Sequence, residues 1–255
     1  MFFDSHCHLD RIGLEEFDNN LDTLLHQTRE QGTEEMVCIG VTLESFEAMY
    51  QLVEPLNNIY ATVGVHPDYE DVREPTVSQL VELSKKEKIV AIGETGLDYI
   101  HTDGPEWQRD RFRIHIDAAI EANKPLVIHT RNAKSDTMGI LKEHQAEKVA
   151  GVMHCFTEDW DMAKQAIDMG FYISISGIVT FKQATNVREM ATKIPSDRLL
   201  IETDSPWLAP VPFRGKTNFP GHVKFVAEKL AEIRHTDLQT IAAQTTNNAR
   251  TLFRL

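Results

Sequence analysis

The sequence contains few cysteines, and none of them are closely spaced. Its 255 residues include three cysteines, Cys7, Cys38 and Cys155, and no C-x-x-C pair. An odd number of separated cysteines provides no disulfide framework, which is typical of proteins from a reducing compartment. We therefore expect a cytoplasmic protein whose cysteines serve as small buried hydrophobic residues.

Long apolar runs are also missing. No stretch approaches the roughly 20 apolar residues that a helix needs to cross a bilayer. The apolar start, Met1 to Phe3, ends at Asp4, and no basic region precedes it. It therefore lacks the form of a secretory signal. The sequence predicts neither a membrane span nor a cleaved leader.

The sequence contains fewer positively charged residues than negatively charged ones. The chain carries 26 Lys and Arg residues against 39 Asp and Glu residues, a formal net charge of −13. This balance argues against a protein that coats duplex DNA, because such binding neutralises phosphates over a broad basic surface. An enzyme that grips a few nucleotides in one cleft stays compatible with it, since bound divalent cations reverse the local field.

The sequence does contain a regular alternation of short β-type runs and longer helical patterns. No low-complexity segment or Gly/Ser linker interrupts it, so we expect one domain over residues 1–255. Most of the predicted strands are rich in Val, Ile and Leu, as are parallel strands that helices cover. They are Phe2–Leu9, Met36–Val41, Ile59–His66, Ile89–Leu97, Leu126–Arg131, Gly151–Phe156, Tyr172–Gly177 and Leu199–Asp204.

The recurrence of these runs predicts the fold class. Their spacing of roughly 30 residues is that of a strand-helix unit, and eight such units predict an α/β protein, a single (β/α)8 TIM barrel with a C-terminal helix. An open doubly wound sheet is the alternative, and it needs a nucleotide-binding fingerprint after its first strand. No G-x-G-x-x-G motif occurs there.

Local signals place helices between the strands. Apolar side chains repeat at helical spacing at Phe112, Ile116, Ala119 and Ile120, and again at Leu238, Ile241, Ala242, Thr245, Ala249 and Leu252. Capping boxes are predicted at Thr76 with Gln79 and at Thr236 with Gln239.

Two histidines close the first predicted strand. His6 and His8 are separated by one residue, and alternate residues of a strand point to the same side. Their imidazoles are therefore expected to face one point, while Cys7 faces away. Imidazole suits zinc, and also manganese or iron when carboxylates join it.

Histidine or an acidic residue closes four later strands as well. These residues are Glu94, His129, His154 and Asp204. In a (β/α)8 barrel the carboxyl ends of all strands meet at one mouth, so the six side chains are expected to converge. Burying this many histidines and acids together would be costly without a metal or tight pairing. The sequence therefore predicts a metal centre.

The ordered set of motifs resembles the TatD family of metal-dependent deoxyribonucleases, within the amidohydrolase superfamily. The resemblance spans essentially the whole chain. The matching stretches are Asp4–Asp10, Gly64–Pro67, Gly93–Tyr99, His129–Arg131, His154–Phe156, Glu202–Pro206, Arg214–Asn218 and Asn248–Phe253.

The resemblance implies two divalent metal ions, with zinc, magnesium and manganese as candidates. By position, His6, His8, Glu94 and Asp204 would hold one ion. Glu94, His129 and His154 would hold the other ion, so Glu94 would bridge the pair. The superfamily often bridges with a carboxylated lysine, and Glu94 occupies that place here.

The resemblance also implies hydrolysis of phosphodiester bonds in DNA by a metal-activated water. Glu94 and Asp204 would be catalytic, with Asp204 as the general base. From strand alternation, Glu202 points the same way as Asp204 and one layer deeper, so it would either orient a metal ligand or form structural hydrogen bonds as a buried residue. Single strands or ends are the expected substrates, because a concave barrel mouth cannot straddle a broad duplex face. No obligate protein partner is indicated.

Several residues near strand ends are candidate substrate contacts. His66 matches the family's Gly-x-His-Pro motif and would contact a phosphate. The other candidates are Arg131, Arg214, Lys216 and Asn218. Phe219 stands where the family usually has a polar residue, and it could stack a base or anchor its loop. The roles of His101 and His222, on loops near the mouth, also stay open.

Two other functions stay open. The same centre could hydrolyse a small ester, amide or phosphoester, or the barrel could persist as a non-enzymatic metal-binding or partner-binding scaffold. A metal-supplemented assay that compares single-stranded DNA with small esters and amides separates the two hydrolases.

Overall fold

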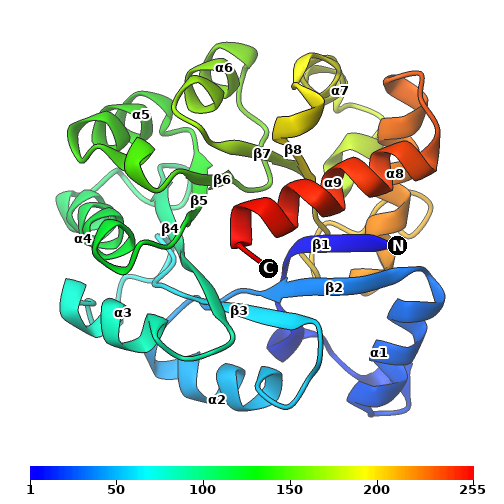
Figure 1. The fold of residues 1–255 in the computed structure, drawn as a ribbon, viewed down its shortest axis with the longest axis horizontal. Coiled ribbons are helices and arrows are strands. Elements are labelled where there is room, and N and C mark those ends of the chain that lie inside the picture. The colour runs from blue at the N-terminus through cyan, green and yellow to red at the C-terminus, as the bar shows by residue number, and fades with distance from the viewer.

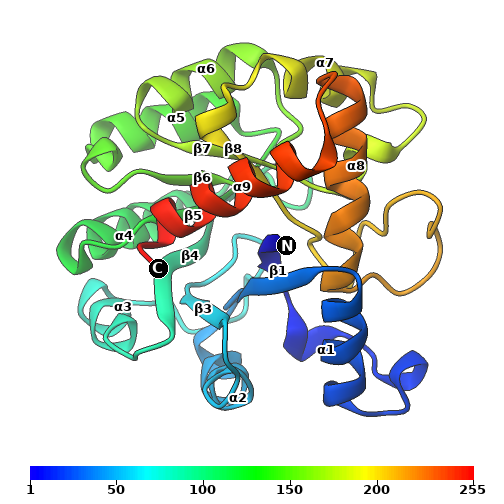
Figure 2. The same cartoon turned by 45° about the vertical axis from the view of Figure 1, so that its right-hand side comes forward.

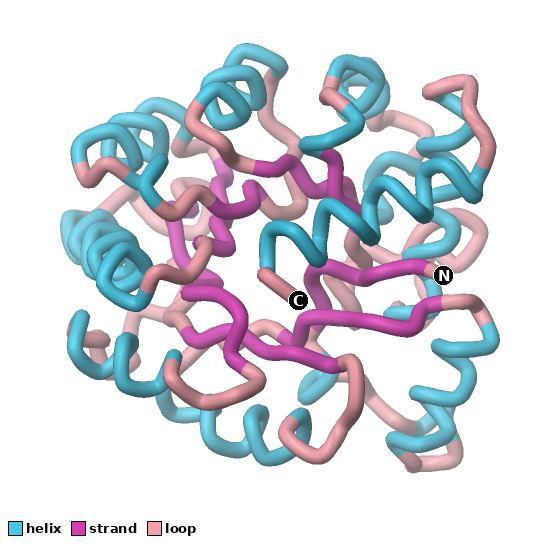
Figure 3. Tube along the Cα trace, viewed as in Figure 1, coloured by secondary structure: helices cyan, strands magenta, loops and turns pink.

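The structure, a computed structural model, describes residues 1–255 and contains eight parallel strands joined in the order β1 to β8. They curl into a nearly closed barrel, which Figure 3 shows as a ring inside a layer of helices. The predicted (β/α)8 fold is confirmed. The strands are β1 (Phe2–Cys7), β2 (Thr33–Cys38), β3 (Ile59–Val63), β4 (Ile89–Asp98), β5 (Leu126–Arg131), β6 (Gly151–Met153), β7 (Tyr172–Ile175) and β8 (Leu199–Ile201).

Eight helices alternate with the strands and a ninth ends the chain (Figure 1). They are α1 (Leu21–Glu30), α2 (Leu43–Val53), α3 (Val77–Ser84), α4 (Glu106–Ala122), α5 (Lys134–Glu143), α6 (Trp160–Asp168), α7 (Thr185–Lys193), α8 (Val223–Ile233) and α9 (Leu238–Phe253). The predicted amphipathic face of α4 is confirmed, because Phe112, Ile116 and Ala119 are fully buried. Apolar burial of this kind supplies most of the stability of a surface helix.

Of the two predicted capping boxes, one is confirmed and the other is wrong. Thr76 and Gln79 form a reciprocal box at the start of α3. At the start of α9 the cap is Asp237, whose carboxylate accepts the backbone N–H of Thr240 at 2.7 Å. A carboxylate at this position also interacts favourably with the helix dipole, which a threonine hydroxyl does not.

Helix α9 covers one end of the barrel. Figures 1 and 2 show it lying across the end at which β1 begins. Leu252 and Phe253 pack there with barrel residues such as Val37 and Leu200 in one buried cluster, and the ring of Phe253 stacks on Phe3 with centroids 6.1 Å apart. The amino-terminal end of the barrel is therefore filled by side chains, and the carboxyl end is free to hold a cavity.

Several strands end earlier than the sequence predicts. His66, His154 and Asp204 lie beyond the ends of β3, β6 and β8. Cys155 and Asp204 have φ angles of 42° and 55°, in the left-handed region, which interrupts an extended strand. His66, His154 and Asp204 therefore stand on the loops just after their strands, whereas His6, Glu94 and His129 lie within β1, β4 and β5.

The barrel closes between its first and last strands. Cys7 and Ser205 form a parallel bridge. The backbone N–H of His8 donates to the carbonyl of Ser205 at 2.8 Å, and that of Asp204 donates to the carbonyl of His6 at 2.9 Å. These bonds set two histidines from the start of the chain beside a carboxylate from near its end.

Two further findings concern membrane spans and cysteines. Among the helices described, none combines the length and apolar character that a membrane-crossing helix requires. Cys7 and Cys38 are buried as expected, and Cys155 is partly exposed.

Candidate metal centre

A cavity of about 760 Å³ opens at the carboxyl end of the barrel. Of the residues predicted to form the site, His8, His66, Glu94, His129, Arg131, His154 and Asp204 line it. His6 is completely buried beneath them. The structure thus brings together all six side chains that the sequence predicts to converge.

Glu94 lies at the centre of the group and is 2% exposed. Its Oε2 atom is 3.3 Å from Nε2 of His6 and 4.0 Å from Nε2 of His8. Its Oε1 atom is 2.8 Å from Nε2 of His154 and 3.3 Å from Nδ1 of His129. The two oxygens of one carboxylate therefore face two separate groups of side chains.

The first cluster consists of His6, His8, Asp204 and Oε2 of Glu94. The Nε2 atoms of the two histidines are 3.2 Å apart. Oδ1 of Asp204 is 3.6 Å from Nε2 of His6 and 3.4 Å from Nε2 of His8. The far ring nitrogens, Nδ1 of both histidines, are buried and have no hydrogen-bond partner.

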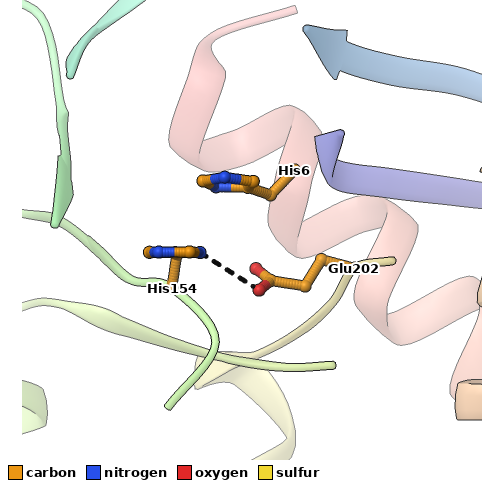
Figure 4. Close-up of side chains that lie close together, drawn as sticks. All are labelled: His6, His154 and Glu202. Carbon is orange, nitrogen blue, oxygen red and sulfur yellow. Dashed lines mark hydrogen bonds and ion pairs between the residues drawn. The ribbon is translucent and has the colours of Figure 1, made fainter. Parts of the chain in front are cut away.

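The second cluster consists of His129, His154 and Oε1 of Glu94. Here each far ring nitrogen donates to a carboxylate: Nε2 of His129 to Asp98 at 3.0 Å, and Nδ1 of His154 to Glu202 at 3.2 Å (Figure 4). Glu202 also accepts the backbone N–H of Cys155 at 2.7 Å. These bonds fix the tautomer of each ring, so the lone pair of its other nitrogen points at Glu94.

Both clusters are suited to hold a positive charge at their centre. In the second cluster the facing atoms of His129, His154 and Glu94 lie 2.8–3.4 Å from one another, so they can share a proton or a metal cation. Zinc binds imidazole and carboxylate at about 2.0–2.2 Å, so its tetrahedral ligands stand about 3.3 Å apart. The donor types and their spacing fit a divalent ion in each cluster.

The ionisation of the clusters follows the same contacts. Burial alone would raise the pKa of Glu94, but the charges of His154, His66 and His6 hold that pKa well below its usual value. Burial would lower the pKa of His154, yet Glu94 and Glu202 raise that pKa well above the usual value. For His6, burial and the charge of His154 prevail, and its pKa is lowered.

A buried aspartate, Asp4, joins β1 to the segment after β8, and the first cluster depends on this junction. Asp4, which is fully buried, accepts the backbone N–H of Thr203 at 2.9 Å and its hydroxyl at 2.5 Å. The same carboxylate accepts the N–H of His6 at 3.3 Å. Asp4 therefore fixes the residue before Asp204 relative to His6, and burial raises its pKa well above the usual value.

Two of the strands that carry these residues have irregular pairing. The register of β1 shifts between Asp4 and Cys7, around His6. The register of β4 shifts between Ile92 and Thr95, around Glu94. Such bulges re-aim side chains near active sites. Gly96 then allows β5 to approach, because a Cβ there, at a φ of +136°, would lie 1.9 Å from the carbonyl oxygen of His129.

Helix α4 holds the segment that carries His66. Three of its buried side chains bond to three successive residues there. His115 accepts the N–H of Val65 at 2.9 Å, Arg111 donates to the carbonyl of His66 at 2.9 Å, and Gln108 donates to the carbonyl of Pro67 at 3.0 Å. The His66 ring is thereby held with its Nε2 atom 3.2 Å from Oε1 of Glu94.

Other predicted contacts lie away from the cavity lining. Arg214 donates to the carbonyl of Ala209, and Lys216 is exposed outside the lining. Asn218 is fully buried, with its amide directed at the carbonyls of Thr203 and Trp207. These side chains are not directed at the clusters because their polar groups bond to the loop or face solvent.

The questions left open by the sequence have structural answers. Phe219 packs edge-on against Phe17 with centroids 5.3 Å apart, so it anchors its loop. His222 is buried and donates to Asn218 at 2.9 Å. His101 lines the cavity, where its Nδ1 lies 3.1 Å from Asp98.

Sequence reasoning missed Asp98, Arg11 and Trp207, which all line the cavity. Asp98 could have been found, because it lies four residues after Glu94 within a matching motif. Nothing in the residue pattern alone distinguishes Arg11 from other surface arginines, or Trp207 from a core aromatic residue.

The chain is similar to known proteins over its full length. The family model "TatD related DNase" matches residues 3–254. The metal-dependent hydrolase YabD of Bacillus subtilis is 43% identical, with 100% of both chains covered. The 3'-5' ssDNA/RNA exonuclease TatD of Erwinia tasmaniensis is 33% identical over 94% of this chain and 96% of its own.

A solved structure agrees with these matches. The crystal structure of YJJV, a TatD homologue from Escherichia coli K12, superposes with a TM-score of 0.91 at 28% identity, covering 100% of this chain and 98% of the other. The fold, the convergent histidines and carboxylates, and the full-length matches lead to one conclusion. The chain belongs to the TatD related DNase family of metal-dependent hydrolases.

Proposed function

We propose that this protein is a divalent-metal-dependent phosphodiesterase that hydrolyses DNA at single-stranded regions or ends. The observation that carries the proposal is that the two carboxylate oxygens of Glu94 face different clusters. Oε2 lies 3.3 Å from His6, and Oε1 lies 2.8 Å from His154. A shared carboxylate between two donor groups is the arrangement of two-metal phosphodiester hydrolysis. A relative named as a single-stranded DNA and RNA exonuclease supports the nucleic-acid substrate.

The two clusters would hold two divalent ions, with zinc, magnesium and manganese as candidates. His6, His8, Asp204 and Oε2 of Glu94 would hold one ion. His129, His154 and Oε1 of Glu94 would hold the other. When bound, such ions lower the pKa of a water molecule towards 7 and draw negative charge from phosphoryl oxygens.

Asp204 would accept the proton of the attacking water. Its side chain is 16% exposed, against 3% for Glu94, so it is the carboxylate of the first cluster that solvent in the cavity reaches. Burial would raise its pKa, but a hydrogen bond from His8 and the charge of His6 lower it. Asp204 is therefore ionised at neutral pH and able to accept a proton.

His66 and Arg131 would bind the substrate phosphate. Nδ1 of His66 accepts the backbone N–H of Asp68 at 3.1 Å, so the ring carries its proton on Nε2, inside the cavity. That N–H faces Oε1 of Glu94 at 3.2 Å, and it would turn to a phosphoryl oxygen when Glu94 holds an ion. Arg131 is exposed at the cavity wall and can supply a charge-assisted bond. Glu202 would keep the His154 ring in its working orientation.

The test uses purified protein supplied in turn with zinc, magnesium or manganese. Single-stranded DNA labelled at either end, the matching duplex, a small ester and a small amide are offered. We expect cleavage of the single strand, and its loss in Asp204→Asn with the fold unchanged by circular dichroism. Turnover of the small ester or amide with DNA left intact would contradict the proposal and favour a small-molecule hydrolase.

A further inference from the structure

One aromatic side chain on the wall of the cavity is exposed to solvent. Five large hydrophobic residues of the chain are exposed, and among them only Trp207, at 48%, is aromatic and lines the cavity. It lies three residues after Asp204, and its ring meets that of His8 with centroids 5.1 Å apart. An exposed indole beside the clusters is a ready surface for a flat apolar ligand.

The backbone of Trp207 is fixed on both sides. Its N–H donates to the carbonyl of Asp204 at 3.0 Å, and its own carbonyl accepts the Asn218 amide at 2.6 Å. The next residue, Leu208, packs on Gly177, where a Cβ would lie 2.3 Å from the Leu208 carbonyl oxygen. Main-chain bonds hold the loop, so the indole ring is not needed to hold it.

A second side chain that lines the cavity is a cation without a close acidic partner. Arg11, which follows His8 in a short 3-10 helix (Leu9–Arg11), lines the cavity with Trp207. Its Nε atom lies 3.9 Å from a carboxylate oxygen of Asp10 and has no hydrogen-bond partner. The guanidinium lies 5.8 Å from the ring centre of Tyr69. It is therefore free to bind a phosphate.

We propose that Trp207 and Arg11 form a nucleotide subsite beside the first cluster. Trp207 stacks on the base next to the cleaved bond, and Arg11 binds the phosphate of that nucleotide. The ligand is an unpaired nucleotide, because a base paired in a duplex has no free face for the indole. This inference rests on the proposed function and specifies which feature of the substrate the protein recognises.

Binding to two phosphorothioate-linked strands, which resist hydrolysis, tests the base contact on metal-loaded protein. One strand has five thymidines, and the other lacks the bases of its terminal nucleotides. Fluorescence anisotropy should show that Trp207→Leu weakens binding of the thymidine strand by about tenfold and leaves the abasic strand unchanged. Trp207→Phe, which keeps a flat ring, should restore most of the affinity.

The matched control is Trp160→Leu, because Trp160 begins α6 outside the cavity. It should bind both strands as the unchanged protein does. Equal losses on the two strands for Trp207→Leu, or no loss on either, would overturn the stacking role. Thermal melting of each variant excludes a general loss of fold.

The salt dependence of binding tests Arg11. Removing one phosphate contact to a single strand should reduce the slope of log K against log salt by about 0.7. We expect this for Arg11→Met, and no change for Arg198→Met, because Arg198 packs on Tyr172 at the start of β7, away from the cavity. An unchanged slope for Arg11→Met would overturn its role.

The subsite and the proposed function fail in different ways. If the unchanged protein cleaves single-stranded DNA while Trp207→Leu binds each strand as tightly as the unchanged protein does, the subsite is wrong and the function stands. If Trp207→Leu shows the base-dependent loss while the unchanged protein hydrolyses only small esters, the subsite stands and the function is wrong.

Discussion

The two clusters share Glu94 but differ in what lies behind their histidines. In the second cluster, Asp98 and Glu202 accept the far N–H of each ring. In the first cluster, Nδ1 of His6 and of His8 has no protein partner. A carboxylate behind a histidine fixes the ring and raises its basicity. The pKa values differ as well: despite burial, Glu94 and, after it, Glu202 raise that of His154 well above its usual value, whereas burial and the charge of His154 lower that of His6.

This difference indicates that one centre can contain a site that binds its metal ion tightly, the firm site, and a site that exchanges its ion readily. We expect the second cluster to retain its ion when metal is scarce. Each cluster has one side chain that is 16% exposed, Asp204 in the first and His129 in the second, so the expected difference comes from the carboxylates behind the second cluster. We expect the ion of the first cluster to leave first, because no protein group supports its two histidines from behind.

The largest effect is expected from Glu94→Gln, which tests whether the clusters depend on one carboxylate. The amide keeps the size of the side chain but removes the charge that faces His6 and His154. We expect hydrolysis to fall on the order of 10³-fold and metal bound per chain, measured by mass spectrometry, to fall as well. Full metal content in this variant would show that Glu94 does not join the clusters.

A smaller effect, confined to the second cluster, is expected from Glu202→Gln and Asp98→Asn. Each amide oxygen can still accept the ring N–H, but the charge behind the ring is lost. Metal affinity should fall about 10–100-fold, as measured by competition with a chelating dye.

The matched control for Glu202→Gln and Asp98→Asn is Glu121→Gln, at an exposed position on α4. It should leave metal affinity unchanged. If Glu202→Gln releases the same ion that mild chelation removes first, the assignment of the firmer site to the second cluster is wrong.

Graded chelation of the unchanged protein tests the asymmetry directly. With rising chelator we expect loss in two steps, with a plateau at one ion per chain, because the two sites differ in what supports their ligands. Metal analysis after gel filtration at each step measures this. A single step from two ions to none would show that the two clusters do not differ in metal affinity.

A last effect, on folding stability rather than on metal binding, sets the pH range in which the clusters can be compared. His115 must stay neutral, because its Nε2 accepts the N–H of Val65 and its Nδ1 donates to the carbonyl of Arg111. Burial lowers its pKa from 6.5 to about 4. Between these values the unfolded chain binds the proton more readily than the folded one, so stability falls as pH falls.

The loss below pH 4 amounts to roughly 3 kcal/mol from this group, at 1.36 kcal/mol per pH unit. Denaturant unfolding at pH 7, 5.5 and 4.5 measures it. His115→Gln, which can still accept from Val65, should be less sensitive to acid over this range. An equal sensitivity would show that another group controls the acid response, and metal comparisons belong above pH 6.5 in either case.

Much of the fold follows from short-range regularities. The strand and helix periods predict the barrel because each β-α unit repeats the same burial pattern. The strand-end positions of His129 and His154 predict their meeting, because parallel strands of a barrel end at one mouth. Both inferences need only the order of elements and not their detailed contacts.

The remaining features depend on contacts that no local pattern records. The pairing shifts around His6 and Glu94 and the carboxylates behind the second cluster arise from tertiary packing. Asn218 illustrates the limit: the sequence match predicts a substrate contact, whereas its buried amide holds the Trp207 carbonyl at 2.6 Å. An amide is equally suited to a phosphate and to a backbone carbonyl, and only its surroundings decide.

The stacking of Phe253 on Phe3 has a consequence for how the chain is made. Translation delivers the first strand long before its aromatic partner in α9. The nascent chain therefore exposes the apolar end of the barrel until α9 has been made. A polypeptide interrupted before α9 would present these apolar side chains to chaperones and proteases.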